Sequence, residues 1–165
     1  MEHSNSKKNI FFFRPYGDNG YFSNFYSINF NINNIKFTSS EQAFMYYKCL
    51  TFDGDNKKLL SKILREFDPN KIKKLGRSVR YFKQDRWNEV KYDIMLKCIR
   101  NKFLQNRVIR EKLINTYPRQ LYEASPWDNI WGIGYDIDTA PVRDPETYGQ
   151  NLLGKALMEI RDEFL

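Results

Sequence analysis

The sequence predicts an α+β fold that is predominantly helical and carries a small antiparallel β-sheet. Two observations predict this class: short apolar runs and alternating runs occur before Thr38, and apolar side chains repeat every three or four positions through most of the remainder. The length of 165 residues suits a single core. An aromatic content of 16% argues against disorder. No apolar run approaches the roughly 20 residues that a membrane span needs, so a membrane-spanning protein is not expected.

The strands are predicted at three places. Residues 10–13 are apolar and indicate the first strand. Residues 28–32 and 35–37 alternate apolar and polar side chains on either side of Asn33-Asn34. Because Asn tolerates the left-handed conformation of tight turns, this pattern predicts an antiparallel hairpin. Residues 121–123 predict a further short strand.

Helical periodicity predicts six helices, over residues 40–50, 56–66, 69–76, 84–105, 107–115 and 151–164. The first has two alternative capping boxes, Thr38 with Glu41 or Ser39 with Gln42. Asp68-Pro69 starts the third helix, and Gly76 is expected to end it. Residues 125–145 have the composition of a loop.

The domain is expected to span residues 10–165, after a flexible N-terminus of residues 1–9. The apolar stretch after the first residues is too short for a signal peptide. Cys49 and Cys98 are far apart in predicted helices, which indicates reduced core thiols and a cytoplasmic protein. With two Cys and the single His3, no metal site is expected.

The chain has 27 basic and 20 acidic residues, a net charge of +7. This surplus favours anionic partners such as nucleotides, phosphates or nucleic acid. Basic residues are spread through the chain, and most are expected only to solvate helix faces.

Glu41 and Lys48 are the first pair that could carry chemistry. They are seven positions apart, so in a helix both side chains project from the same side, with their Cα atoms about 10.5 Å apart along the axis. A lysine amine of lowered pKa can attack a sugar anomeric carbon, with a carboxylate nearby to move protons. The alternative is a capping Glu and a solvated Lys. The helix dipole stabilises the anion of a first-turn carboxylate, which suits Glu41 as a base or a charge stabiliser.

Two aromatic loops could line a ligand. In residues 20–25, Phe22, Ser23 and Asn24 could clamp a base or ribose, or they could form a packed turn. In residues 123–134, Asp128 stands among two indoles and two glycines. It could orient a sugar hydroxyl, or it could cap a turn while Trp127 and Trp131 close the core.

Two glycine-containing segments could meet phosphate. Residues 149–155 open the last helix with Asn151 and Gly154, and backbone N–H groups at a helix start can hold a phosphate. The spacing is not that of a P-loop, and close helix packing is the alternative. After Gly76, Arg77 could meet a phosphate or a neighbouring acid.

Taken together and in order, these segments resemble the NADAR family, also known as YbiA-like proteins. The matching stretches lie within residues 20–25, 38–48, 75–77, 102–106, 123–132 and 149–154, together with Trp87. The resemblance covers nearly the whole chain from Ile10 to Leu165 and implies one domain of this family. It implies an N-glycosidase that cleaves the bond between a ribose and a nitrogen base. Two substrate classes are associated with the family, ADP-ribose on guanine in nucleic acid and ribosylamino intermediates of riboflavin biosynthesis.

By position, the resemblance makes Glu41, Lys48, Trp87 and Asp128 the catalytic candidates. Substrate contacts are expected from Phe22, Ser23, Asn24, Arg77, Trp127, Trp131, Gly132, Asn151 and Gly154. The expected partner is an ADP-ribose-containing or ribosylamino substrate, including ADP-ribosylated DNA or RNA, with no cofactor and no metal. Either Lys48 forms a Schiff base with C1 while Glu41 moves protons, or the reaction follows an oxocarbenium route with Glu41 or Asp128 as base. The alternative function is a non-catalytic module that binds ADP-ribose or nucleic acid.

Overall fold

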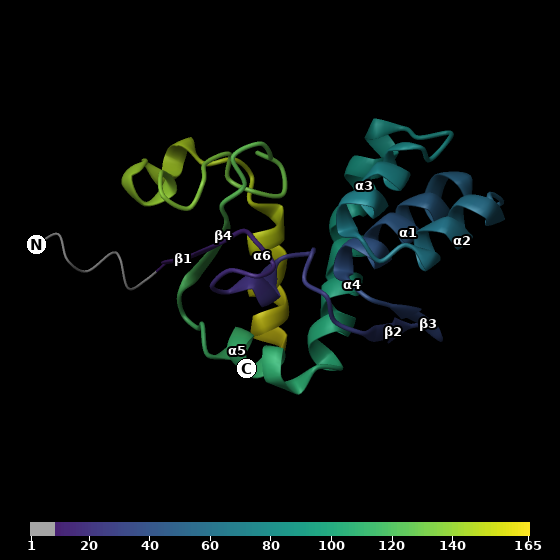
Figure 1. The fold of residues 1–165 in the computed structure, drawn as a ribbon. Helices are drawn as coiled ribbons and strands as arrows, with labels where there is room; N and C mark the ends of the chain where they lie inside the picture. The colour runs from purple at the N-terminus through teal and green to yellow at the C-terminus, as the bar shows by residue number, and fades with distance from the viewer. Residues whose placement is uncertain (1–8) are drawn as a thin grey trace, which may run out of the picture. The chain divides into compact units, whose positions relative to one another are not determined.

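The computed structural model describes residues 9–165, and its contacts divide the chain into two units. Residues 27–106 form the first, which we call the Lys48 unit. Residues 9–26 and 107–165 form the second, which we call the Asp128 unit. Figure 1 labels the helices and strands of both units, and each unit is described separately below.

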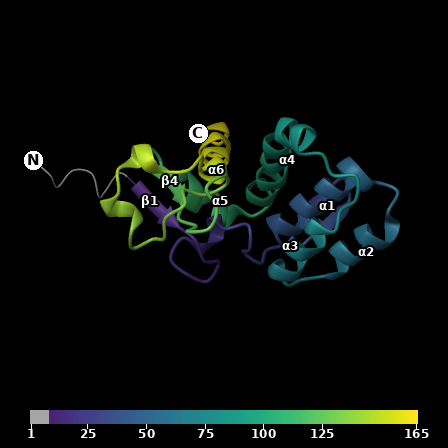
Figure 2. The same ribbon diagram turned by 90° about the horizontal axis from the view of Figure 1, so that it is seen from above.

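The Lys48 unit is a set of helices with one β-hairpin. Its elements are β2 (Phe30–Ile32), β3 (Ile35–Phe37), α1 (Ser40–Asp53), α2 (Lys57–Arg65), α3 (Pro69–Arg77) and α4 (Gln84–Leu104). The hairpin is antiparallel, with Asn33 and Asn34 at positive φ in its turn, as the sequence predicts. Helix α1 packs against α2, α3 and α4 (Figure 2). The core of the unit includes Phe30, Phe37, Cys49, Ile63, Ile72, Met95, Cys98, Ile99 and Phe103.

The start of α1 is fixed by one of the two predicted capping boxes. Ser39 Oγ accepts a hydrogen bond from the Gln42 backbone N–H at 3.1 Å, and Gln42 Oε1 accepts from the Thr38 N–H at 2.7 Å. The Gln42 side chain also donates through Nε2 to carbonyls at the end of α2, including that of Ile63 at 3.0 Å. The structure therefore confirms the pair of Ser39 and Gln42, and it gives Gln42 a structural role between two helices.

The expectation that Gly76 ends α3 is wrong, because the helix continues through Arg77. The glycine is buried where α3 lies against α1. A Cβ atom at this position would lie 2.0 Å from the Met45 Sδ atom. The glycine thus leaves room for the Met45 side chain where the two helices pack closely, and it does not terminate the helix.

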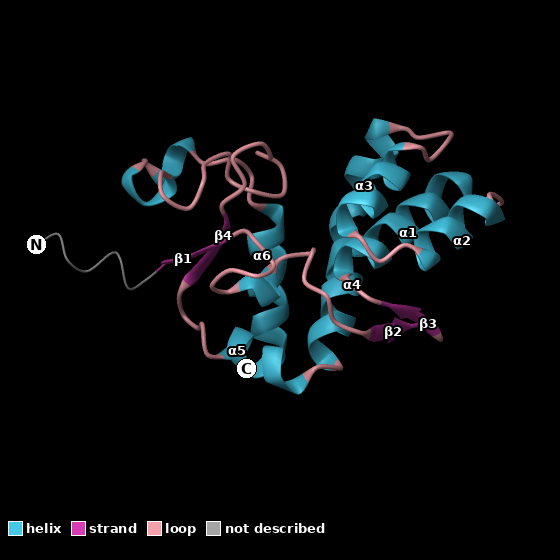
Figure 3. Cartoon of the chain, viewed as in Figure 1, coloured by secondary structure: helices cyan, strands magenta, loops and turns pink. Residues whose placement is uncertain are grey.

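The Asp128 unit contains two strands and two helices joined by long loops (Figure 3). Strand β1 (Asn9–Phe12) pairs in parallel with β4 (Gln120–Glu123), and α6 (Leu152–Glu163) packs on β4. The other elements are α5 (Arg107–Ile114) and the 3-10 helices η1 (Gly20–Phe22), η2 (Ala140–Val142) and η3 (Pro145–Thr147). The predicted strands exist, but the parallel pairing of β1 with β4 was not foreseen. Such a pairing needs no local turn signal, since the partners are distant in sequence.

The predicted class, predominantly helical α+β with a small antiparallel sheet, is confirmed. Of the expected flexible N-terminus, residues 1–8 lie outside the described residues, whereas Asn9 belongs to β1. Cys49 and Cys98 are both free and buried, as predicted. Within residues 9–165, no helix is both long and apolar enough to cross a bilayer, and no group of three His, Cys, Asp or Glu is placed to hold a metal ion.

Candidate functional site

Lys48 lies in α1 with its amine against aromatic rings. The Nζ atom is 4.9 Å from the centre of the Phe82 ring and 5.8 Å from that of Trp87. Partial burial lowers the pKa of Lys48, the nearby Glu41 carboxylate opposes this shift, and the Arg77 guanidinium adds to it. The effect of burial is the largest, so at a given pH a larger fraction of Lys48 is neutral than of an exposed lysine. This is the condition that a nucleophilic amine requires.

The aromatic side chains around Lys48 come from α1 and from the segment that enters α4. The Trp87 ring is buried and lies 5.2 Å from Phe44 and 6.1 Å from Phe52. Phe82 lies 5.1 Å from Phe52. These rings form a wall that excludes water from one side of the amine and explains its desolvation. Trp87 was predicted from the family resemblance, whereas Phe82 was missed because it stands before the periodic part of α4.

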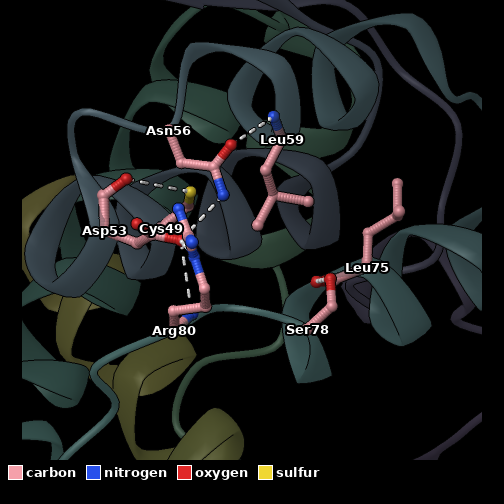
Figure 4. A network of polar contacts seen from close by, with 7 residues as sticks. All are labelled: Cys49, Asp53, Asn56, Leu59, Leu75, Ser78 and Arg80. Atoms are coloured by element: carbon pink, nitrogen blue, oxygen red, sulfur yellow. Dashed lines mark hydrogen bonds and ion pairs between the residues drawn. The ribbon is translucent and has the colours of Figure 1, made fainter.

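The Asp53 carboxylate at the end of α1 holds the segment that carries Phe82 (Figure 4). Its Oδ2 atom accepts hydrogen bonds from Asn56 Nδ2 at 2.8 Å and from the Arg80 backbone N–H at 3.3 Å, and the Arg80 Nε lies 3.5 Å away. The hydrogen bond from Asn56 and those from Arg80 hold the pKa of Asp53 below its usual value. Next to Arg80, Tyr81 adopts a φ of 61° with a side chain that is 72% exposed. A positive φ is uncommon for such a bulky residue, so the surrounding contacts must impose it.

Lys102, in α4, is a second lysine in an unusual environment, for which the sequence predicted no role. Its side chain is fully buried, and burial lowers its pKa to about 7. Other residues of the motif at 102–106 have structural roles. Gln105 exchanges two hydrogen bonds with the backbone of Asn31, and Asn106 Nδ2 donates to the Asn29 carbonyl. This end of α4 thereby holds the strand β2.

In the Asp128 unit, Asp128 has the turn-capping role that was one of its two predicted alternatives. Its Oδ1 atom accepts hydrogen bonds from the N–H groups of Ile130 and Trp131, both at 2.9 Å. The indoles do not close a core as that alternative expects. Trp127 is 87% exposed, 6.5 Å from the Phe13 ring, and Trp131 is partly buried. Trp127 is therefore a surface ring that a ligand can reach.

The start of α6 is packed against the loop rather than open to a phosphate. The N–H groups of Asn151, Leu152 and Leu153 donate to the carbonyls of Gly132, Ile130 and Trp131. Because these three donors are occupied, the helix start agrees with the alternative of close packing, and binding of phosphate there stays a prediction.

The side chains at the start of α6 have structural contacts as well. Asn151 donates through Nδ2 to the Leu121 carbonyl at 2.9 Å and accepts from the Glu123 N–H at 3.0 Å. A Cβ at Gly154 would lie 2.2 Å from the Leu121 oxygen, and one at Gly132 would lie 2.9 Å from the Glu123 oxygen. Both glycines thus permit close approach of backbones. Contact of Gly132, Asn151 or Gly154 with substrate stays a prediction.

The first aromatic loop has buried and accessible parts. Phe22 is fully buried with its ring centre 5.6 Å from that of Phe12, so it has a role in the core, and its contact with substrate stays a prediction. Ser23 Oγ accepts from the Phe25 N–H at 3.1 Å, and Asn24 is partly buried. For Ser23 and Asn24, substrate contact stays a prediction.

The structure brings together Glu41, Lys48, Arg77 and Trp87 within the Lys48 unit. The remaining predicted residues belong to the Asp128 unit. The model of the NADAR domain family matches residues 11–165, which include all of the Lys48 unit and nearly all of the described Asp128 unit. This chain belongs to the NADAR family.

Three curated proteins are similar to this chain in sequence. The protein irg-1 of Caenorhabditis elegans is 40% identical over 132 residues, which are 78% of this chain and 61% of that protein. An N-glycosidase of Acanthamoeba polyphaga mimivirus is 42% identical over 149 residues, 86% of each chain. A riboflavin biosynthesis protein of Vibrio vulnificus is 30% identical over 154 residues, 93% of this chain but 38% of that protein. The chain therefore spans less than two thirds of the first and third of these relatives.

A solved structure agrees with the NADAR assignment. The NMR structure of the Escherichia coli protein YbiA matches with a TM-score of 0.77 and 29% identity, over 96% of this chain and 85% of that chain. A curated relative from the same organism is named N-glycosidase YbiA and is 30% identical. The fold of this chain is thus that of a NADAR domain over nearly its whole length.

Proposed function

We propose that this chain is a hydrolase that cleaves the N-glycosidic bond between a ribose carbon and a nitrogen base. The observation that carries the proposal is the Lys48 amine, whose pKa is lowered by burial beside the Glu41 carboxylate and the Trp87 ring. Relatives named N-glycosidase support the same reaction type.

In the proposed reaction, the neutral Lys48 amine attacks C1 of the ribose and the bond from C1 to the base nitrogen breaks. The departing base takes up a proton, and opening of the ring leaves an imine between C1 and Lys48. Water then adds to C1, the amine leaves, and the sugar closes with a hydroxyl at C1. Glu41 moves the protons in both halves. The net reaction consumes one water and needs no oxidant or reductant.

For the substrate we propose ADP-ribose attached to guanine in nucleic acid. The Arg77 guanidinium beside Lys48 and the net charge of +7 support an anionic substrate that carries several phosphates. A ribosylamino intermediate of riboflavin biosynthesis is the second candidate, because one relative is named a riboflavin biosynthesis protein. The role that the family resemblance implies for Asp128, to stabilise the cationic carbon or position a ribose hydroxyl, stays a separate prediction.

The test is to incubate the protein with an oligonucleotide that carries ADP-ribosylated guanine and, separately, with a ribosylamino-pyrimidine phosphate, and to measure released base and sugar by mass. We expect release from the first, and loss of release in both Lys48→Arg and Lys48→Met. Since arginine keeps the positive charge but supplies no nucleophilic amine, full activity of Lys48→Arg would contradict covalent catalysis. Binding of both substrates without any product would support a non-catalytic binding module instead.

A further inference from the structure

The positive charge of the chain is concentrated on two neighbouring helices. Residues 57–77 contain eight Lys or Arg and two acidic residues, a net charge of +6 out of the +7 of the whole chain. Neither α2 nor α3 contains a carboxylate. The two acids, Glu66 and Asp68, lie in the turn between the helices, where their side chains accept backbone N–H groups.

All eight cations are exposed, and within residues 9–165 none of them forms an ion pair. In each helix they occupy the part of the surface that the buried residues leave exposed; the buried residues are Leu59 and Ile63 in α2 and Ile72 and Gly76 in α3. Both helices pack on α1 and on each other, so their outward faces adjoin (Figure 2). We call this surface the α2–α3 basic face, composed of Lys57, Lys58, Lys62, Arg65, Lys71, Lys73, Lys74 and Arg77.

The α2–α3 basic face reaches the candidate site. Its last member, Arg77, is close enough to Lys48 to lower the pKa of that amine. Just beyond it, Tyr81 exposes most of its ring, with the Arg80 guanidinium 5.6 Å from the ring centre. A row of cations beside an exposed ring is the combination that binds a single strand, through its phosphates and by base stacking.

We propose that the α2–α3 basic face binds the phosphate backbone of a nucleic acid and leads one nucleotide toward Lys48. Backbone binding itself does not depend on catalysis; only the placement of the modified nucleotide rests on the proposed function. An anionic membrane is the other polyanion to consider. Helices that lie on membranes insert an apolar face, whereas here the apolar faces of both helices are buried in the protein, and Phe67 in the turn is a single exposed apolar ring.

The experiment measures binding of the full chain to unmodified, fluorescein-labelled DNA and RNA, single-stranded and duplex, by anisotropy over a range of salt concentrations. The test variant is Lys62→Glu with Lys71→Glu and Lys74→Glu. The matched control reverses three exposed cations elsewhere, Lys36→Glu with Lys112→Glu and Arg143→Glu, and so has the same net charge. A third variant, Lys62→Gln with Lys71→Gln and Lys74→Gln, removes the same charges without introducing acids. It separates the loss of binding from unfolding caused by the new carboxylates.

We expect the test variant to bind at least about tenfold more weakly, with a plot of log K against log salt that is about 2 units shallower, because three phosphate contacts are lost. The Gln variant should show the same direction of change, and the control should bind nearly as the parent does. Equal losses in test and control variants, or no loss in either the Glu or the Gln variant, would overturn the proposal. Binding to phosphatidylserine vesicles without binding to any oligonucleotide would overturn it in favour of a membrane. If the parent binds oligonucleotides but hydrolyses neither substrate, the surface stands and the proposed function fails.

Discussion

The polar candidate residues of the two units have different surroundings. In the Asp128 unit, Asp128 and Asn151 direct their side chains to backbone groups, and Gly154 lets α6 approach β4. In the Lys48 unit, the Lys48 amine is held against aromatic rings at a lowered pKa. A desolvated amine is costly for stability, and such sites are common where chemistry is done.

This difference helps to separate motif residues that serve the fold from those that serve function. A conspicuous loop of Asp, Asn and Gly can be accounted for by turn formation and close packing, as around residues 128–154. A lysine whose environment disfavours its charge is harder to explain by packing alone. The contrast between the two units can be tested by substitutions in each of them.

The largest effect is expected for Glu41→Gln, which should lower kcat about 100- to 10,000-fold because the proton-transfer group is removed. The Glu41 carboxylate raises the pKa of Lys48, so its removal should lower that pKa further. The rising limb of the pH–rate profile, which reports the neutral amine, should then move to lower pH. The control is Asp55→Asn, which makes the same change from carboxylate to amide at an exposed position of the same unit. A normal rate with an unmoved limb would remove Glu41 from the mechanism.

A smaller effect, on stability, is expected for Gly154→Ala in the Asp128 unit. The added Cβ would meet the Leu121 carbonyl oxygen at 2.2 Å, so α6 and β4 must separate. We expect the free energy of unfolding in urea to fall by about 1–3 kcal/mol. The exposed neighbour Lys155→Ala should change it by less than about 0.5 kcal/mol. A raised KM with unchanged stability would show instead that Gly154 serves the substrate.

The smallest effect is a pH dependence of stability from Lys102 in the Lys48 unit. Burial lowers its pKa from 10.5 to about 7 in the folded chain, so between these values the unfolded chain binds more protons. Stability must therefore rise with pH from about 7, by up to about 1.4 kcal/mol per pH unit. Above about pH 8.5 the thiols of Cys49 and Cys98, whose pKa values are raised by burial, oppose the trend, because they ionise first in the unfolded chain.

Urea unfolding between pH 7 and pH 8 measures this slope for the parent and for Lys102→Met. The Met variant should have a clearly shallower profile in that range, because Lys102 no longer contributes whereas Lys48, whose pKa burial also lowers, still does. A parent profile that is already flat, or a Met variant with the parent's slope, would assign the dependence to another group.

Much of the local structure could be predicted from the sequence because its causes are local. The hairpin turn at Asn33-Asn34 and the cap at Ser39 depend on residues within a few positions, and both occur as predicted. The parallel pairing of β1 with β4 depends on residues far apart in the chain, and no local pattern records it. Gly76 was misassigned for the same reason, since its partner is Met45 on another helix.

The candidate site could be predicted in part. The seven-residue spacing placed Glu41 and Lys48 on one side of a helix, and the effect of the carboxylate on Lys48 agrees with that placement. The role of Phe82 could not be predicted, because it depends on the hydrogen bonds of Arg80 to Asp53 across the unit. The expectation that basic residues are spread through the chain is wrong for net charge, because residues 57–77 carry most of the surplus.

Reductive trapping tests the central claim, that the Lys48 amine forms a covalent bond to the ribose, most directly. The protein is incubated with its substrate in the presence of cyanoborohydride, and the modified residue is located by mass spectrometry. The account predicts a reduced ribosyl adduct on Lys48, dependent on substrate and absent from Lys48→Arg. Continued release of free base with no adduct on Lys48 would contradict it and would favour direct attack by water.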